Sequence, residues 1–351
     1  MQFFKKNVIK TAFFIKQKIF EGGLKIQADK WVKFTYYKKL NNEIVIPALR
    51  EIYEKKTAEN IDECGKYVNI AVCQSCGAEH FAGYFNCKTR WCFNCLNKRL
   101  LCWIKRIMPI LEQWYSEGNF CTKMNFTVRD SMPLNAPLKS LEESFRAIYN
   151  GSSARRKKWH ERFPGGVRSL EVKLGKNSGE WHPHYHCLTL QKYGEYEKDY
   201  YWVSDLWHEI LGYNGIVIKK DGTQDFNWNG NVYLQKVYRK RNNTGLINAV
   251  AESLKYIVKI DEKLDSELNR NFYKDKELFS DLFYTLKGKR QTSSWGLLYG
   301  IGKQIDEDMK SENYEKLIDF VCQKCGFTEA ELITKIYEDI TEQSVLLDIK
   351  K

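Results

Sequence analysis

Three of the chain's six histidines stand at alternating positions within five residues, in the segment WHPHYHCL. On a β-strand successive side chains point to opposite faces, so that His182, His184 and His186 would project together from one face. Two imidazoles so placed can clamp a metal ion. Histidines hydrogen-bonded within a sheet without metal are the alternative, and three on one face favour the metal site.

A metal site of this type requires a carboxylate, and Glu171 is placed to supply it. Residues 166–174 and 181–190 are strand-like, and GKNSGE between them predicts a hairpin turn. If Glu171 lies opposite His184 or His186, it falls on the histidine face, unless a bulge shifts the register. The predicted ligands are therefore His184, His186 and Glu171, with His182 as a further candidate. This mixed nitrogen and oxygen set suits Mg²⁺ or Mn²⁺ acting on a phosphate, whereas a surface glutamate is the alternative.

A late helical segment, TGLINAVAESLKYIVKI, carries a second group of reactive side chains. Glu252, Tyr256 and Lys259 fall opposite its apolar stripe. A phenol such as that of Tyr256 can attack a phosphodiester, while Lys259 stabilises the negative charge that develops. Glu252 could activate a water or a 3′-hydroxyl for a second transfer. Taken alone, these three residues are more typical of a solvated helix face.

Five of the eleven cysteines crowd into 23 residues, which is typical of metal binding in a reducing compartment. The spacing Cys-x2-Cys occurs at Cys73 and again at Cys92, and it matches two zinc knuckles. We predict a structural Zn²⁺ site with the ligands Cys73, Cys76, Cys92 and Cys95. Cys87 or Cys64 could replace one of these four. A third pair, Cys322 and Cys325, has no second pair near it in the sequence, and we interpret it as two unbound thiols.

The charge balance indicates a polyanionic partner. The net formal charge is +12, although residues 304–351 contain 12 acidic and only 6 basic side chains. A basic body of this kind is typical of nucleic-acid binding, whereas a merely solvated lysine-rich surface is the alternative. Trp159 and Tyr238 could stack on unpaired bases. The candidate DNA-binding residues are Lys88, Arg90, Lys98, Arg99, Arg155, Arg156, Arg239, Lys240, Arg241, Lys289 and Arg290.

An α+β fold would position these side chains, with a central antiparallel sheet and flanking helices. Strands are predicted at 120–128, 166–174, 181–190, 215–219 and 231–238, and helices at 138–149, 198–211 and 245–260. The predicted organisation is a basic helical segment (1–62), a cysteine module (63–103), a catalytic domain (118–303) and an acidic helical tail (304–351). No apolar stretch approaches eighteen residues, so we expect a cytoplasmic protein without a membrane partner.

Four segments, in this order, carry a more specific resemblance: FNCKTRWCFNC, FTVRD, HPHYHCL and ESLKYIVK. Together they resemble the rolling-circle plasmid replication initiators of the HUH endonuclease superfamily, over roughly residues 64–296. The motif of two histidines flanking a hydrophobic residue maps onto His184-Tyr185-His186. Asn125, directly before FTVRD, stands where a threonine is usual, and Phe93 stands where the family usually has proline.

The resemblance implies a ferredoxin-like or RRM-like sheet carrying an endonuclease that nicks one strand at a replication origin. Tyr256 would become joined to the 5′-phosphate, freeing a 3′-hydroxyl for the host polymerase, with a host helicase as a further partner. Glu252 matches a glutamate that one branch of the family uses for the terminating cleavage. The nick site would be hairpin or single-stranded DNA, and the oligomeric state stays open.

Two alternatives remain at this point. Insertion-sequence transposases combine a similar cysteine module with the same histidine motif, although the basic segment LKGKRQTSSWG after the tyrosine helix favours the initiator. The second alternative is a zinc-ribbon DNA-binding protein without catalysis. Covalent attachment to origin DNA would distinguish the nicking enzyme from such a binding protein.

Overall fold

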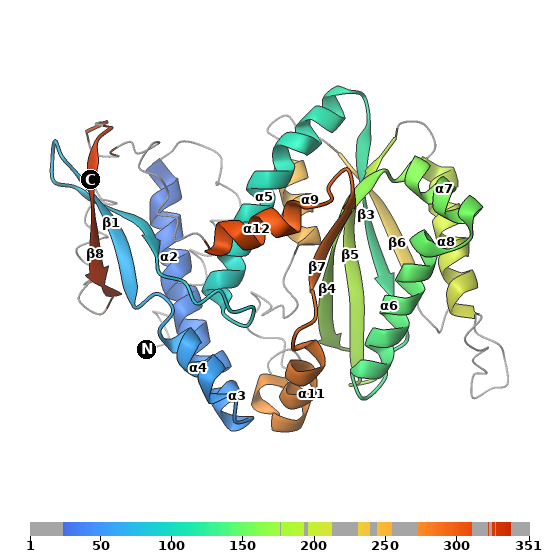
Figure 1. Cartoon of the computed structure of the whole chain (residues 1–351), viewed down its shortest axis with the longest axis horizontal. Helices are drawn as coiled ribbons and strands as arrows, with labels where there is room; N and C mark the ends of the chain where they lie inside the picture. The colour runs from blue at the N-terminus through green and yellow to red at the C-terminus, as the bar shows by residue number, and fades with distance from the viewer. Residues whose placement is uncertain are drawn as a thin grey trace. The chain divides into compact units, whose positions relative to one another are not determined.

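The structure is a computed structural model in which residues 24–175, 177–192, 196–212, 231–238, 244–254, 272–310, 322, 325–326 and 328–337 are described (Figure 1). The chain divides into two compact units. Residues 1–97 and 308–351 form one unit, and residues 98–307 form the other. Within the described ranges, no helix combines the length and the apolar character needed to cross a membrane.

The first unit combines short helices with a three-stranded antiparallel sheet in the order β2-β1-β8. Its helices are α2 (Leu24–Leu40), the π-helix η1 (Asn41–Val45), α3 (Ile46–Glu51) and α4 (Lys55–Asp62). Helix α5 (Phe93–Ser116) begins in this unit and continues into the second. The strands are β1 (Tyr67–Cys73), β2 (Glu79–Tyr84) and β8 (Ala330–Ile336). Phe34 of α2 packs on the sheet beside Ile70 and Phe81.

Strand β8 comes from the C-terminal region that we expected to be a separate helical tail. It pairs with β1 over the full length of both strands, from Tyr67 opposite Ile336 to Cys73 opposite Ala330 (Figure 1). Helix α12 (Ile301–Lys310) also crosses the predicted boundary at residue 304. The expectation of a helical tail is wrong for residues 330–336, because the β-branched run Ile-Thr-Lys-Ile suits a strand and the edge of β1 supplies backbone partners.

The second unit confirms the predicted α+β fold. Its five-stranded antiparallel sheet has the order β6-β3-β5-β4-β7. The strands are β3 (Phe120–Thr127), β4 (Gly165–Leu174), β5 (Trp181–Gln191), β6 (Val232–Val237) and β7 (Thr292–Gly296). The flanking helices are α6 (Asn135–Asn150), α7 (Ser153–Arg162), α8 (Tyr196–Gly212), α9 (Thr244–Ser253) and α11 (Lys276–Leu286). The predicted strand at 215–219 lies outside the described residues.

The two faces of this sheet have different coverings. On one face, Phe126 of β3 packs edge-on against Phe145 of α6 and Trp207 of α8, and Tyr185 of β5 also meets Phe145. Because side chains alternate along a strand, His184 and His186 lie on the opposite face. Helix α9 contacts strands β4, β5 and β6. The apolar face therefore packs against α6 and α8, and the opposite face carries the histidines.

Candidate metal centres

The hairpin of β4 and β5 brings the predicted ligands face to face. Its pairing runs without a register shift, with Glu171 opposite His184 and Ser169 opposite His186. Glu171 and Ser169 therefore share the histidine face, as the hairpin prediction required.

The three side chains converge on one point. Oε2 of Glu171 lies 2.8 Å from Nε2 of His184 and also contacts Nε2 of His186, and the two Nε2 atoms are 2.9 Å apart. Ligand bonds of about 2.1 Å in octahedral geometry separate neighbouring ligand atoms by about 3 Å, which matches this spacing. These residues could therefore hold a divalent metal ion.

The protonation states suit such a site. Burial works against ionisation of Glu171, but hydrogen bonds with His184 and His186, together with their charges, hold the pKa of Glu171 well below its usual range. Burial lowers the pKa of His184, and the nearby His186 and Lys173 act in the same direction. A carboxylate and a neutral imidazole are the forms that bind metal.

A contact on the far side of the His186 ring orients that ring. Oδ1 of Asn125, on β3, lies 2.7 Å from Nδ1 of His186, its partner across the strands. An amide oxygen only accepts hydrogen bonds, so Nδ1 of His186 donates to Asn125, and this bond holds the ring with Nε2 directed toward Glu171. The sequence singled out Asn125 only as a departure from FTVRD-like motifs.

His182, the further candidate ligand, does not join the cluster. Its Nδ1 lies 2.5 Å from Oδ1 of Asp130, and Ser178 donates to the other oxygen of the same carboxylate at 2.6 Å. The metal-ligand atoms of Glu171, His184 and His186 form a group without it. His182 lies next to the hairpin turn, where the carboxylate of Asp130 provides a closer partner than the other imidazoles.

The end of helix α9 is fastened beside these residues. Ser169 Oγ donates to the carbonyl of Ser253 at 2.6 Å, and both residues are buried. Lys123 of β3 forms an ion pair with Glu252 at 2.5 Å. Tyr256 and Lys259 lie outside the described residues. Ser169 had no signal in the sequence beyond its position opposite His186.

Two other tyrosines, Tyr273 and Tyr233, differ in how exposed they are. Tyr273 is fully enclosed, and burial raises its pKa far above the usual range, so it is a poor nucleophile. Tyr233 on β6 stands opposite Asn125 in the register and is 56% exposed. It therefore lies on the histidine face and serves as a matched comparison for Tyr256.

The structure corrects the predicted zinc quartet, because Cys73 and Cys76 lie in a different cluster from Cys92 and Cys95. One cluster holds Cys64, Cys87, Cys92 and Cys95, and the other holds Cys73, Cys76, Cys322 and Cys325. The reason is the length of β2, whose six residues extend for about 20 Å and separate the two ends of the hairpin. Cys322 and Cys325, which we interpreted as two unbound thiols without a second pair nearby, in fact lie beside the pair Cys73 and Cys76.

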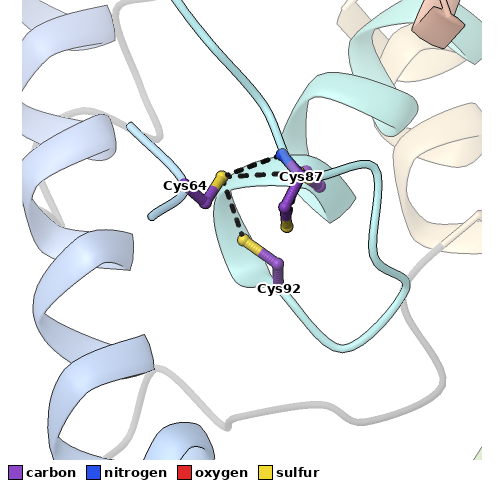
Figure 2. Close-up of side chains that lie close together, drawn as sticks. Cys64, Cys87 and Cys92 are labelled. Atoms are coloured by element: carbon purple, nitrogen blue, oxygen red, sulfur yellow. Dashed lines mark hydrogen bonds between the residues drawn. The ribbon is translucent and has the colours of Figure 1, made fainter. Parts of the chain in front are cut away.

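The first cluster gathers sulfurs from three segments, with Cys64 after α4, Cys87 after β2 and the pair Cys92 and Cys95 at α5. Figure 2 shows Cys64, Cys87 and Cys92 of this cluster. Sulfur–sulfur distances from Cys64 are 3.5 Å to Cys92 and 3.6 Å to Cys95. The backbone N–H of Cys87 donates to the sulfur of Cys64 at 3.4 Å (Figure 2). Four sulfurs around Zn²⁺, with bonds of about 2.3 Å, would lie about 3.8 Å apart, so this group could hold such an ion.

A buried asparagine supports this cluster from the N-terminal helices. The side-chain amide of Asn41 donates to the sulfur of Cys92 at 3.3 Å, and its oxygen accepts from the N–H of Phe93 at 2.9 Å. Asn41 is fully buried at the start of η1. The sequence did not indicate this residue, since its role depends on a helix that is remote from the cysteines along the chain.

The predicted DNA-binding residues divide into three groups. Three of them form ion pairs within the unit, namely Arg99 with Asp306, Arg155 with Glu209, and Lys289 with Glu142. Lys88, Arg156 and Arg290 are exposed, while Arg90 and Lys98 are half-buried. Arg239, Lys240 and Arg241 lie outside the described residues.

The two aromatic residues predicted to stack on bases differ in exposure. Tyr238 is 71% exposed, whereas Trp159 is 1% exposed and packs against Phe163 and Trp202. The stacking prediction is therefore wrong for Trp159, because its ring belongs to the core under α7.

Comparisons with known proteins place the chain among replication proteins. A family model described as "Replication protein" matches residues 79–339. A protein named "Protein rep" from Lentilactobacillus hilgardii is 26% identical over 277 residues, covering 76% of this chain and 81% of the relative. Another of the same name from Streptococcus pneumoniae is 26% identical over 260 residues, covering 72% and 73%. A third, from Staphylococcus aureus, is 23% identical and covers 60% and 93%. No solved structure gives a significant match.

Proposed function

Because this chain belongs to the replication protein family, we propose that it starts rolling-circle replication of a plasmid by nicking one DNA strand at the origin. The observation that carries the proposal is the convergence of Glu171, His184 and His186 on one point of the sheet face opposite Phe145. The family match favours an initiator over a transposase.

The ligand set defines the chemistry. When bound, Mg²⁺ or Mn²⁺ supplies Lewis-acid polarisation of the scissile phosphate. Glu171, His184 and His186 would hold the ion, with Glu171 contributing the negative charge. A neutral His184 is ready to bind without first losing a proton, and the contact with Asn125 orients the ring of His186.

Tyr256 is the nucleophile in this proposal. Its oxygen forms a bond to phosphorus as the bond to the 3′-oxygen breaks, which yields a 5′-phosphotyrosine link and a free 3′-hydroxyl. Lys259 stabilises the charge on the phosphate oxygens. Ser253 supports the assignment, because its carbonyl is fixed to Ser169 and three residues of chain span at most about 11 Å. Within that length of chain, the proposal puts the phenol of Tyr256 beside the ligands.

Glu252 serves the second transfer, which closes the replicated strand. Its carboxylate is exposed at the end of α9 and is paired with Lys123. From there it accepts a proton from water or from the 3′-hydroxyl that attacks the phosphate. The ion pair lies on the sheet face that carries the ligands, because Lys123 alternates with Asn125 along β3.

DNA is the partner that this chemistry requires. The exposed cations Lys88, Arg156 and Arg290 would contact phosphates, and Tyr238 would stack on an unpaired base of a hairpin or single-stranded nick site. A host helicase would then separate the strands, and a host polymerase would extend the 3′-hydroxyl.

The test is incubation of the chain with supercoiled origin plasmid and Mn²⁺. We expect nicked circles that carry protein on the 5′ end, no adduct with Tyr256→Phe, and an unchanged adduct with the matched variant Tyr233→Phe. His184→Ala with His186→Ala should bind DNA without nicking it. A salt-sensitive shift with intact plasmid would instead indicate a binding protein, and an adduct formed by Tyr256→Phe would assign the nucleophile to another tyrosine.

A further inference from the structure

Two segments at opposite ends of the first unit build the same turn. Each has the sequence Cys-x2-Cys-Gly, beginning at Cys73 and at Cys322. Gly77 and Gly326 have φ angles of +67° and +74°, a region that glycine adopts without a steric penalty. The N–H of each glycine donates to the carbonyl of the first cysteine, at 2.9 Å and 2.8 Å respectively. A repeated turn of this form is typical of a pair of zinc knuckles.

The four sulfurs of the two turns come together. Cys73 lies 3.6 Å from Cys325, and Cys76 lies 3.5 Å from Cys322. All four ligand atoms are within 4.8 Å of one another, and none of the four residues forms a disulfide. Tetrahedral thiolate ligands of Zn²⁺ lie about 3.8 Å apart, so the ion fits with little adjustment. Soft thiolates favour Zn²⁺ over the harder ions expected at the histidine site.

The cluster is partly enclosed, since Cys73 and Cys322 are buried, Cys76 is half-buried and Cys325 is exposed. Nε2 of His80, on β2, lies 3.5 Å from the sulfur of Cys322, and both residues are buried. Small residues, Ala71 and Ala78, pack beside Cys73. Cys73 ends β1 directly opposite Ala330, the first residue of β8. The cluster therefore sits where the C-terminal strand joins the sheet.

We infer that the chain holds a second structural zinc ion, bound by Cys73, Cys76, Cys322 and Cys325, in addition to the one that fits Cys64, Cys87, Cys92 and Cys95. This second ion fastens the C-terminal strand to the cysteine module. Because the ligands come from both ends of the unit, zinc binding and the pairing of β8 with β1 are linked. The inference concerns structure and does not depend on the nicking chemistry.

The experiment counts zinc in the full-length chain. His184→Ala with His186→Ala is the background, so that the histidine site does not contribute zinc. Elemental analysis should give two zinc ions per chain for this background. Cys322→Ser with Cys325→Ser should give one, Cys92→Ser with Cys95→Ser should also give one, and the matched change Cys102→Ser should leave two.

A second measurement covers variants that fail to fold. In the unaltered chain, alkylation followed by mass spectrometry should find Cys322 and Cys325 protected until a chelator removes zinc, and then reactive together with Cys73 and Cys76. The inference is overturned if the background holds a single zinc ion, if the Cys322 and Cys325 double variant keeps two, or if these cysteines are found as disulfides.

Discussion

Asn125 fixes the orientation of His186, since its side-chain oxygen lies 2.7 Å from Nδ1 of the imidazole and faces it across two paired strands. The other ring nitrogen then meets Glu171. A residue that contacts no reacting atom therefore controls which nitrogen of His186 is available to a metal.

Asn125→Ala should weaken metal binding without removing a ligand. Loss of the partner frees the ring and its tautomer, and we expect metal affinity to fall by about 10- to 100-fold. The measurement is nicking rate against Mn²⁺ concentration, where the half-saturating concentration should rise while the rate at saturating Mn²⁺ changes little. Asn125→Thr, which keeps a hydrogen-bonding oxygen, should restore part of the affinity. An unchanged Mn²⁺ dependence in Asn125→Ala would rule out the positioning role.

Acid should destabilise the metal-free chain through His184. Its pKa is lowered in the folded chain, so the unfolded chain binds a proton more readily as pH falls past the ordinary value of 6.5. Stability is therefore highest above that pH and falls below it, by at most about 1.4 kcal/mol per pH unit for this group. Glu171, whose pKa is also lowered, adds a loss only below about pH 4.3.

Thermal unfolding in a chelator between pH 7.5 and pH 5.5 measures this effect. His184→Gln should flatten the dependence, whereas His160→Gln, at an exposed position on α7, should leave it as it is. Equal slopes in the unaltered chain and in His184→Gln would contradict the assignment.

The sequence predicted the histidine centre well because its geometry is local. The alternation of His182, His184 and His186 and a short hairpin turn are enough to place Glu171 opposite His184, as observed. The exclusion of His182 could not be predicted, since it depends on the side chain of Asp130, which arrives from another segment. The α+β fold could also be predicted, because the periodicity of each strand and helix depends only on residues that are close together in the sequence.

The two cysteine clusters were harder to predict because their members are distant in sequence. Proximity along the chain favoured pairing Cys73 with Cys92, but a whole strand separates them, and Cys73 instead meets Cys325 from 252 residues away. The repeated Cys-x2-Cys-Gly pattern was the available signal. Trp159 shows the converse error, since a surface role was expected of a side chain that fills the core.

Ser169→Ala should slow formation of the covalent adduct while leaving metal binding intact. Ser169 holds the carbonyl of Ser253, and losing this hydrogen bond costs about 1 kcal/mol of positioning for the residues that follow. We expect about a fivefold slower single-turnover adduct formation at saturating Mn²⁺. Ser294→Ala on β7, the neighbouring strand, is the matched control and should have no effect. A loss of Mn²⁺ affinity in Ser169→Ala would show that Ser169 acts through the ligands instead.

Glu252→Gln should separate the two transfers of the proposed reaction. The amide keeps the size of the side chain and can still hydrogen-bond, but it accepts no proton, so the first nick should form at nearly the normal rate. Strand closure should fall by at least about 100-fold, the usual contribution of a general base. The measurement follows nicked and closed circular products over time from the same reaction.

Lys123 provides the control, because Lys123→Met removes its ion pair with Glu252 and leaves the carboxylate in place. That variant should still close the strand, since an exposed ion pair contributes little and Glu252 keeps its acceptor oxygens. If Glu252→Gln closes circles normally, a different base acts in the second transfer. If it fails already at the first nick, Glu252 supports the attacking tyrosine instead of the closing step.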